Sequence, residues 1–317
     1  MNNYQTLPSI KRLLGLHKGQ KDGPFFVVMA AIHGNEAAGI YALKRVFRQL
    51  KTLNVPFCGH FLGLTGNVRA VKQQKRFIDV DLNRQWDKEK TELIFNTPTH
   101  ALEMSEELEQ KELLNRFYKY RNEFKEHYHN RNMVLLDLHT FSAKKGGAYS
   151  IATKNGESQH WAARLNVPTI IGLETVIKGT TMHFFNDFDM TSFCFEAGQH
   201  DDPLAVDRME SALWLTLCNI GCINKKDVPN YDAHYRLLHK IGENLPQIVE
   251  FSYRHAIVPS DNFEMKKGYT NFMTVKKGEI LATDKNGVVC SPVDGMILMP
   301  LYQKQGEDGF FIVKKVK

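Results

Sequence analysis

The sequence is poor in cysteine and has no CxxC pair. Its 317 residues include five cysteines, an odd number. Disulfide scaffolds of secreted domains carry dense, paired sets of cysteines, and closed cysteine-rich zinc sites use CxxC spacings. The cysteine content therefore argues against both classes. It predicts a reducing compartment, for which we take the cytoplasm.

Long hydrophobic runs and concentrated charge are also absent. The longest apolar run covers residues 25–32, whereas a helix that crosses a bilayer needs about 20 apolar residues. The first residues, MNNYQTLPSIKRLLG, contain no apolar core like that of a secretory signal. Lys and Arg number 41 against 35 Asp and Glu, without the basic block of nucleic-acid-binding proteins. We therefore expect neither a membrane nor a nucleic acid as partner, and the net charge of +6 suits a small anionic substrate.

The stretch AAIHGNEAAG, residues 30–39, connects a predicted strand to a predicted helix. The run before it is apolar on both faces, as in a buried parallel strand, and a helical period follows it. In open α/β sheets, ligands bind just past the carboxyl ends of strands, where His33 and Glu36 fall. Their spacing lets an imidazole and a carboxylate converge on one zinc ion. The alternative is a surface histidine and a glutamate that favours a helix N-terminus.

A second histidine, His139, closes another predicted strand at residues 133–138, in the run LLDLHT. Together with His33 and Glu36 it would leave one coordination position open for water, as in a catalytic zinc site. Asp137 lies on the same strand face. It either orients a metal ligand or binds local backbone, and the sequence leaves both interpretations open.

Glu196 follows a third apolar run, residues 193–195. Near a metal, such a carboxylate can serve as a general base toward water. Without a metal, a solvent-exposed carboxylate at a helix start or in a loop is the simpler interpretation.

The loop RFIDVDLNR, residues 76–84, offers two guanidiniums and an amide. Arg84 and Asn83 can bind a carboxylate, and Arg76 can stabilise a developing oxyanion. The alternative is an exposed loop whose arginines pair with its own aspartates.

These motifs, in this order, resemble the succinylglutamate desuccinylase/aspartoacylase family of the zinc metallocarboxypeptidase group. The resemblance rests on HGNE, RFIDVDLNR, DLHT and EAG, which begin at residues 33, 76, 137 and 196. It implies one zinc ion per chain. The metal ligands it implies are His33, Glu36 and His139.

The resemblance also implies roles for the remaining residues. Glu196 is the expected base and proton shuttle, and Arg76 is expected to polarise the carbonyl. Asn83 and Arg84 are expected to hold a substrate carboxylate.

The chain departs from the family pattern in two places. Members that act on N-acetylaspartate carry a further arginine shortly before the catalytic glutamate, whereas residues 180–195 contain none. This argues against N-acetylaspartate as substrate. Those members also place a tyrosine from the C-terminal domain in the site. Tyr302 is a weak candidate here, and Phe310 or Phe311 is the alternative.

We predict an α/β fold with a mixed, mostly parallel central sheet flanked by helices, like that of zinc carboxypeptidases, over residues 1–225. Short β-like runs broken by glycines predict a small β-barrel or sandwich domain at residues 226–317. The predicted function is a zinc-dependent amidohydrolase that deacylates an N-acyl amino acid or a related small substrate. The alternatives are a peptide-cleaving zinc carboxypeptidase and a non-enzymatic ligand-binding relative. A homo-oligomer is left open.

Overall fold

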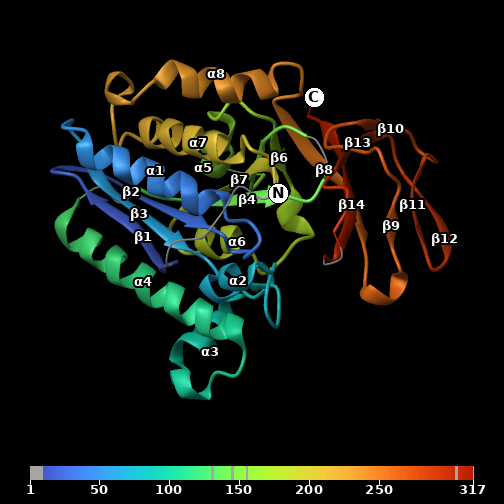
Figure 1. Ribbon diagram of the computed structural model, residues 1–317, viewed down its shortest axis with the longest axis horizontal. Helices are drawn as coiled ribbons and strands as arrows, with labels where there is room; N and C mark the ends of the chain where they lie inside the picture. Colours follow the sequence, from blue (N-terminus) through green and yellow to red (C-terminus); the bar gives the residue numbers. More distant parts are fainter. Residues whose placement is uncertain (1–9, 130–131, 144–145, 155, 304–305, 317) are drawn as a thin grey trace.

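The computed structural model describes residues 10–316 except 130–131, 144–145, 155 and 304–305 (Figure 1). The elements of its N-terminal part are, in order, β1 (Leu13–Lys18), β2 (Lys21–Ala30), α1 (Ala38–Thr52), β3 (Cys58–Thr65), α2 (Val68–Gln73), η1 (Leu82–Arg84), α3 (Lys88–Asn96), η2 (Thr99–Ala101), α4 (Ser105–His127), β4 (Met133–Phe141), β5 (Tyr149–Ala152), α5 (Glu157–Ala163), β6 (Thr169–Ile171), η3 (Leu173–Thr175), α6 (Thr181–Asn186), β7 (Thr191–Gln199) and α7 (Ala205–Asn219).

The C-terminal part is dominated by short strands. Its elements are η4 (Lys225–Asp227), α8 (Tyr231–Gly242), β8 (Ile248–Ala256), η5 (Pro259–Asp261), β9 (Glu264–Met265), β10 (Thr274–Val275), β11 (Ile280–Asp284), β12 (Gly287–Cys290), β13 (Gly295–Leu298) and β14 (Asp308–Lys315).

A large mixed sheet runs through the molecule in the order β1-β3-β2-β4-β7-β5-β6-β8-β14-β13-β10. Its centre is parallel, because β2 pairs in parallel with β3 and β4, and β4 pairs in parallel with β7. Val28, Leu136 and Phe193 lie side by side on these three strands, and all are fully buried. The predicted mixed, mostly parallel sheet is therefore confirmed.

Helices cover both faces of this sheet (Figure 1). Side chains alternate along a strand, so Phe26 and Val28 of β2 pack with α1 and α7 in one core. Phe25 and Val27 point to the opposite face and pack with α4 in a second core. This two-sided burial explains why the strand has an unbroken apolar run instead of an alternating one.

The C-terminal strands form a small sandwich against the end of the large sheet. A second sheet, in the order β12-β11-β9, faces β10, β13 and β14 across a core that includes Leu281, Ile297 and Phe310. Strand β8 pairs with β6 on one side and with β14 on the other, so one sheet continues from the N-terminal part into the C-terminal part. The domain boundary between residues 225 and 226 stays a prediction.

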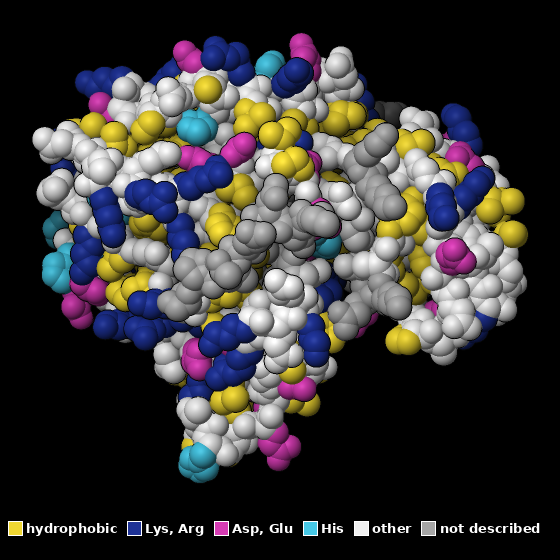
Figure 2. Space-filling model, viewed as in Figure 1, with side chains coloured by type: hydrophobic (Ala, Val, Ile, Leu, Met, Phe, Trp, Pro, Cys, Tyr) yellow, Lys and Arg dark blue, Asp and Glu magenta, His cyan; other side chains and the backbone are white. Residues whose placement is uncertain are grey.

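Charged side chains are mixed on the surface. On the face shown in Figure 2, Lys and Arg lie scattered among acidic and apolar side chains. Within the described ranges, no helix is long and apolar enough to span a membrane.

One buried histidine makes the stability of this fold sensitive to pH. His60 of β3 is 3% exposed, and its ring lies edge-on to Phe124 and Tyr128, with ring centroids 5.5 and 4.8 Å away. Burial, assisted by the nearby Lys18, lowers the pKa of His60 to about 4. The unfolded chain therefore binds this proton at a higher pH than the folded chain does.

We predict that His60→Phe raises the thermal unfolding midpoint relative to wild type as the pH falls from 6.5 to 4. The wild type must bury a group that prefers to be charged in this window, and the variant does not. The midpoint difference should grow by roughly 2 °C or more between pH 7 and pH 4.5. Scanning calorimetry measures it, and His100→Phe, at an exposed histidine, is the control. Parallel pH curves for wild type and His60→Phe would contradict the prediction.

Candidate active site

A cavity opens where the carboxyl ends of β2, β4 and β7 meet the C-terminal segment. It encloses about 1100 Å³ of space, part of which is open to solvent. All seven residues predicted from the sequence to form the site line it: His33, Glu36, Arg76, Asn83, Arg84, His139 and Glu196. Four of them lie at the carboxyl ends of parallel strands, which share one edge of the sheet. The three from residues 76–84 come from the segment between α2 and α3.

The turn after β2 is tightly packed against α2. Gly34 donates its backbone N–H to the carbonyl of Arg76, at 3.0 Å. A β-carbon at Gly34 would lie only 2.2 Å from the carbonyl carbon of Ala70, so this position accepts glycine alone. The turn thereby fixes His33 and Glu36 at the floor of the cavity.

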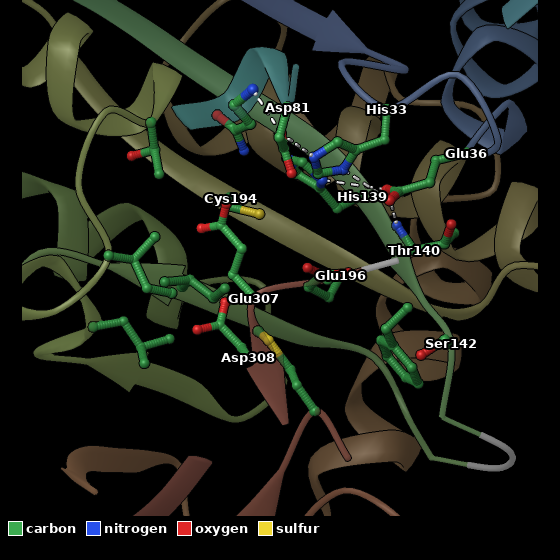
Figure 3. Close-up of a pocket in the computed structure, with 18 of the residues that line it drawn as sticks. His33, Glu36, Asp81, His139, Thr140, Ser142, Cys194, Glu196, Glu307 and Asp308 are labelled. Atoms are coloured by element: carbon green, nitrogen blue, oxygen red, sulfur yellow. Dashed lines mark hydrogen bonds and ion pairs between the residues drawn. The ribbon is translucent and has the colours of Figure 1, made fainter. Parts of the chain in front are cut away.

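The three predicted metal ligands converge (Figure 3). His33 Nδ1 lies 2.8 Å from Glu36 Oε1, and His139 Nδ1 lies 3.2 Å from Glu36 Oε2. One ligand atom from each residue lies within 4.8 Å of the others, and all three side chains are buried. His33 is therefore not a surface histidine, whereas Glu36 does lie just before the start of α1.

A carboxylate holds the other nitrogen of each histidine. His33 Nε2 lies 3.1 Å from Asp81 Oδ1, and His139 Nε2 lies 3.1 Å from Asp137 Oδ2. Such partners fix the ring orientation and the tautomer of metal-binding histidines. Asp137 thus contacts a predicted metal ligand, in agreement with the interpretation that it orients such a ligand. No local pattern indicated that Asp81, 48 residues from His33, would do the same.

The donor set fits a divalent cation. Burial opposes the charged form of Glu36, but His33 and His139 outweigh it and hold the pKa of Glu36 well below its usual range. Two imidazole nitrogens and one carboxylate oxygen, all facing inward, are donors that zinc accepts. With Asp81 and Asp137 behind the imidazoles, the cluster carries negative charge that a cation would balance.

Glu196 lies beside this triad on β7, opposite His139 in the strand register. It is 7% exposed, and its Oε2 has no hydrogen-bond partner within the described chain. Burial, reinforced by the negative charge of Glu36, raises the pKa of Glu196 to about 8. A carboxyl group in this environment can accept and release a proton near neutral pH.

Acidic neighbours hold the Arg76 side chain in its position at the cavity. Its Nε and Nη2 donate to Asp81 Oδ2 at 3.2 and 3.0 Å, and its Nη1 lies 3.5 Å from Glu36 Oε1. Asp81 therefore contacts both an arginine, as the loop alternative supposed, and a histidine. The loop is not exposed in the way that alternative required.

Asn83 and Arg84 lie on η1 at the side of the cavity. Asn83 Oδ1 accepts hydrogen bonds from the backbone N–H and the hydroxyl of Thr181, at 2.9 and 3.2 Å. This fixes the orientation of the amide. Arg84 Nη2 lies 3.3 Å from Asp308 Oδ2, a partner that sequence reasoning missed.

No candidate for the expected tyrosine supplies a hydroxyl to the described part of the cavity. The Tyr302 hydroxyl donates to the carbonyls of Lys266 and Tyr269, inside the C-terminal sandwich. Phe310 packs in the core of that sandwich, whereas Phe311 lines the cavity.

The catalytic-domain model of the succinylglutamate desuccinylase/aspartoacylase family matches residues 22–217, and the chain belongs to this family. Its members are deacylases, hydrolases that act on amide bonds. Among curated relatives, the succinylglutamate desuccinylase of Pseudomonas paraeruginosa is 25% identical over 300 residues, covering 89% of this chain and 81% of the relative.

Solved structures show the same fold. The succinylglutamate desuccinylase/aspartoacylase of Rhodobacter sphaeroides aligns with a TM-score of 0.66 at 12% identity, over 95% of this chain and 88% of that one. The product-bound ectoine utilization protein EutE of Ruegeria pomeroyi aligns with a TM-score of 0.65 at 13% identity, over 95% and 87%.

We predict that His139→Ala loses the bound metal. The wild type, incubated with zinc and dialysed, should retain about one equivalent, and the variant should retain less than a tenth of that because one of three donors is gone. Elemental analysis by mass spectrometry measures the ratio. His183→Ala, which changes a cavity histidine outside the triad, should retain the metal. Stoichiometric zinc in His139→Ala would contradict the assignment of the ligands.

Proposed function

We propose that this chain is a zinc-dependent amidohydrolase that removes the acyl group from an N-acyl amino acid or a related small substrate. The observation that carries the proposal is the convergence of two imidazole Nδ1 atoms on the Glu36 carboxylate, next to Glu196, whose Oε2 has no hydrogen-bond partner among the described residues. A zinc ion held by His33, Glu36 and His139 would supply Lewis-acid chemistry toward water and an amide carbonyl.

Glu196 manages the proton in this proposal. Its carboxylate accepts a proton from the attacking water and returns it to the leaving amine when the C–N bond breaks. Its burial beside the triad supports the role, because a desolvated carboxylate is a stronger base than one in water.

Arg76 stabilises the negative charge that develops on the attacked carbonyl oxygen. Its bonds to Asp81 hold the guanidinium in place before substrate arrives, so little reorganisation is needed during the reaction. Asn83 and Arg84 bind the substrate carboxylate.

The shape of the cavity favours a small substrate over a polypeptide. Met299, Leu301 and Asp308, from the C-terminal part of the chain, form one of its walls. A wall on this side leaves less room for a long peptide chain than an open cleft would. A purely ligand-binding protein would not need Glu196. The cytoplasm as location stays a prediction from cysteine content.

We predict that Glu196→Gln lowers kcat by roughly 100-fold or more while the protein keeps its zinc, because general-base catalysis contributes about 10²–10⁴. The assay follows release of free amino acid from a panel of N-acetyl and N-succinyl amino acids. Glu92→Gln, at an exposed glutamate on α3, serves as control. Unchanged hydrolysis by Glu196→Gln would show that another group moves the proton.

A further inference from the structure

The cationic groups of the cavity are already engaged by carboxylates. Within the described chain, Arg76 and Arg84 are the Arg and Lys side chains that line it. Arg76 is bonded to Asp81 and lies close to Glu36. Arg76 is therefore held beside the proposed metal ligands. Arg84 is the arginine that remains available to bind a substrate carboxylate.

Arg84 also contacts an acidic side chain of the protein itself. Asp308 at the start of β14 places Oδ2 3.3 Å from Arg84 Nη2, and its Oδ1 accepts from Arg254 Nε at 2.6 Å. Arg254 is held in turn by the carbonyl of Val176, at 2.9 Å. Asp308, on the C-terminal wall, therefore engages part of the hydrogen-bonding capacity of the Arg84 guanidinium.

The donors that Arg84 has left suffice for one carboxylate. Of its five N–H groups, one faces Asp308 and one donates to the carbonyl of Asn83 at 2.9 Å. The three remaining donors are enough for a single substrate carboxylate. A second carboxylate on the substrate would find no further guanidinium within the described cavity.

Two other carboxylates line the cavity, Glu307 and Glu174, and neither forms an ion pair with a Lys or Arg among the described residues, although the ammonium of Lys154 interacts electrostatically with Glu174. Figure 3 shows Glu307 extending its carboxyl group into the cavity beside Asp308. Glu174 accepts a bond from the backbone N–H of Lys154 through Oε1, while its Oε2 is buried without a hydrogen-bond partner. A buried, unpartnered carboxylate oxygen is costly unless a donor arrives.

The histidines on these walls do not supply the missing positive charge at neutral pH. Burial lowers the pKa of both His183 and His200. The Lys178 amino group donates to the backbone carbonyl of Glu174, not to its carboxylate. Among the described residues that line the cavity beyond the triad, carboxylates therefore outnumber the Lys and Arg side chains, of which Arg84 is the one not bonded to Asp81.

We infer that the substrate is an N-acyl amino acid with a positively charged side chain, whose single carboxylate binds to Asn83 and Arg84. The side-chain cation is then bound by Glu307, which lies beside Asp308 on the C-terminal wall (Figure 3). This rests on the proposed function and names its substrate class. A diacid is disfavoured because its second carboxylate would meet Glu307 and Asp308 instead of a cation.

The test measures binding separately from hydrolysis. The Glu196→Gln protein, loaded with zinc, is titrated calorimetrically with Nα-acetyl-L-ornithine, Nα-acetyl-L-glutamine and Nα-acetyl-L-glutamate, and with the Nα-succinyl series. In at least one series, the ornithine compound should bind roughly tenfold tighter than the glutamate compound, with glutamine between them. The wild type should show the same order in kcat/KM.

Variants of the cavity carboxylates test which residues cause the preference for a cationic side chain. Adding Glu307→Gln should shrink the ornithine-to-glutamate ratio severalfold, mainly by weakening the ornithine compound. Asp308→Asn should tighten the glutamate compound. Glu264→Gln, which removes an exposed charge on β9 of the same sandwich, should leave the ratio unchanged.

Glutamate compounds that bind as tightly as ornithine compounds, a ratio insensitive to Glu307→Gln, or no binding in either series would each overturn the inference. Binding in the expected order without hydrolysis by the wild type would instead refute the proposed function and leave the inferred ligand class intact.

Discussion

The site depends on one buried carboxylate. Glu36 is 2% exposed, and each of its oxygens lies beside an imidazole nitrogen, from His33 on one side and His139 on the other. The backbone N–H of Thr140 adds a bond to Oε2 at 2.9 Å. A buried anion is tolerated only when neighbours compensate its charge and satisfy its oxygens. Glu36 therefore ties the turn after β2 to the end of β4, and this junction is where a cation fits.

Further acidic residues position the side chains around Glu36. Asp81 contacts His33 with one oxygen and Arg76 with the other, so one residue aligns a predicted ligand and the predicted oxyanion donor. The loop that carries them is held from behind by Glu106 of α4, which accepts hydrogen bonds from the backbone N–H groups of residues 78–80. The loop is thus part of a rigid wall, although its charged sequence is typical of an exposed segment.

The C-terminal part of the chain acts on the site through the continuous sheet. Because β8 pairs with β6 and β14 pairs with β8, the start of β14 is held at the edge of the cavity. Asp308 and Glu307 reach the site from there. The N-terminal strands build the side with the candidate metal ligands, whereas the carboxylates of the opposite wall come from this segment. In a family of deacylases with one catalytic fold, such a wall can change substrate preference without disturbing the chemistry.

The sequence by itself determined the central strands, the helices on both sides and the candidate ligands, because strand-end histidines, two-sided apolar runs and ordered motifs are local signals. It did not predict that Asp81 would face His33, that Tyr302 would bond within the sandwich, or that Asp308 would reach Arg84 across 224 residues. These contacts depend on how distant strands pair, and no local pattern encodes such pairing. The tertiary structure therefore decided which charges meet in the cavity, while the sequence had already decided which kinds of side chain were available to meet.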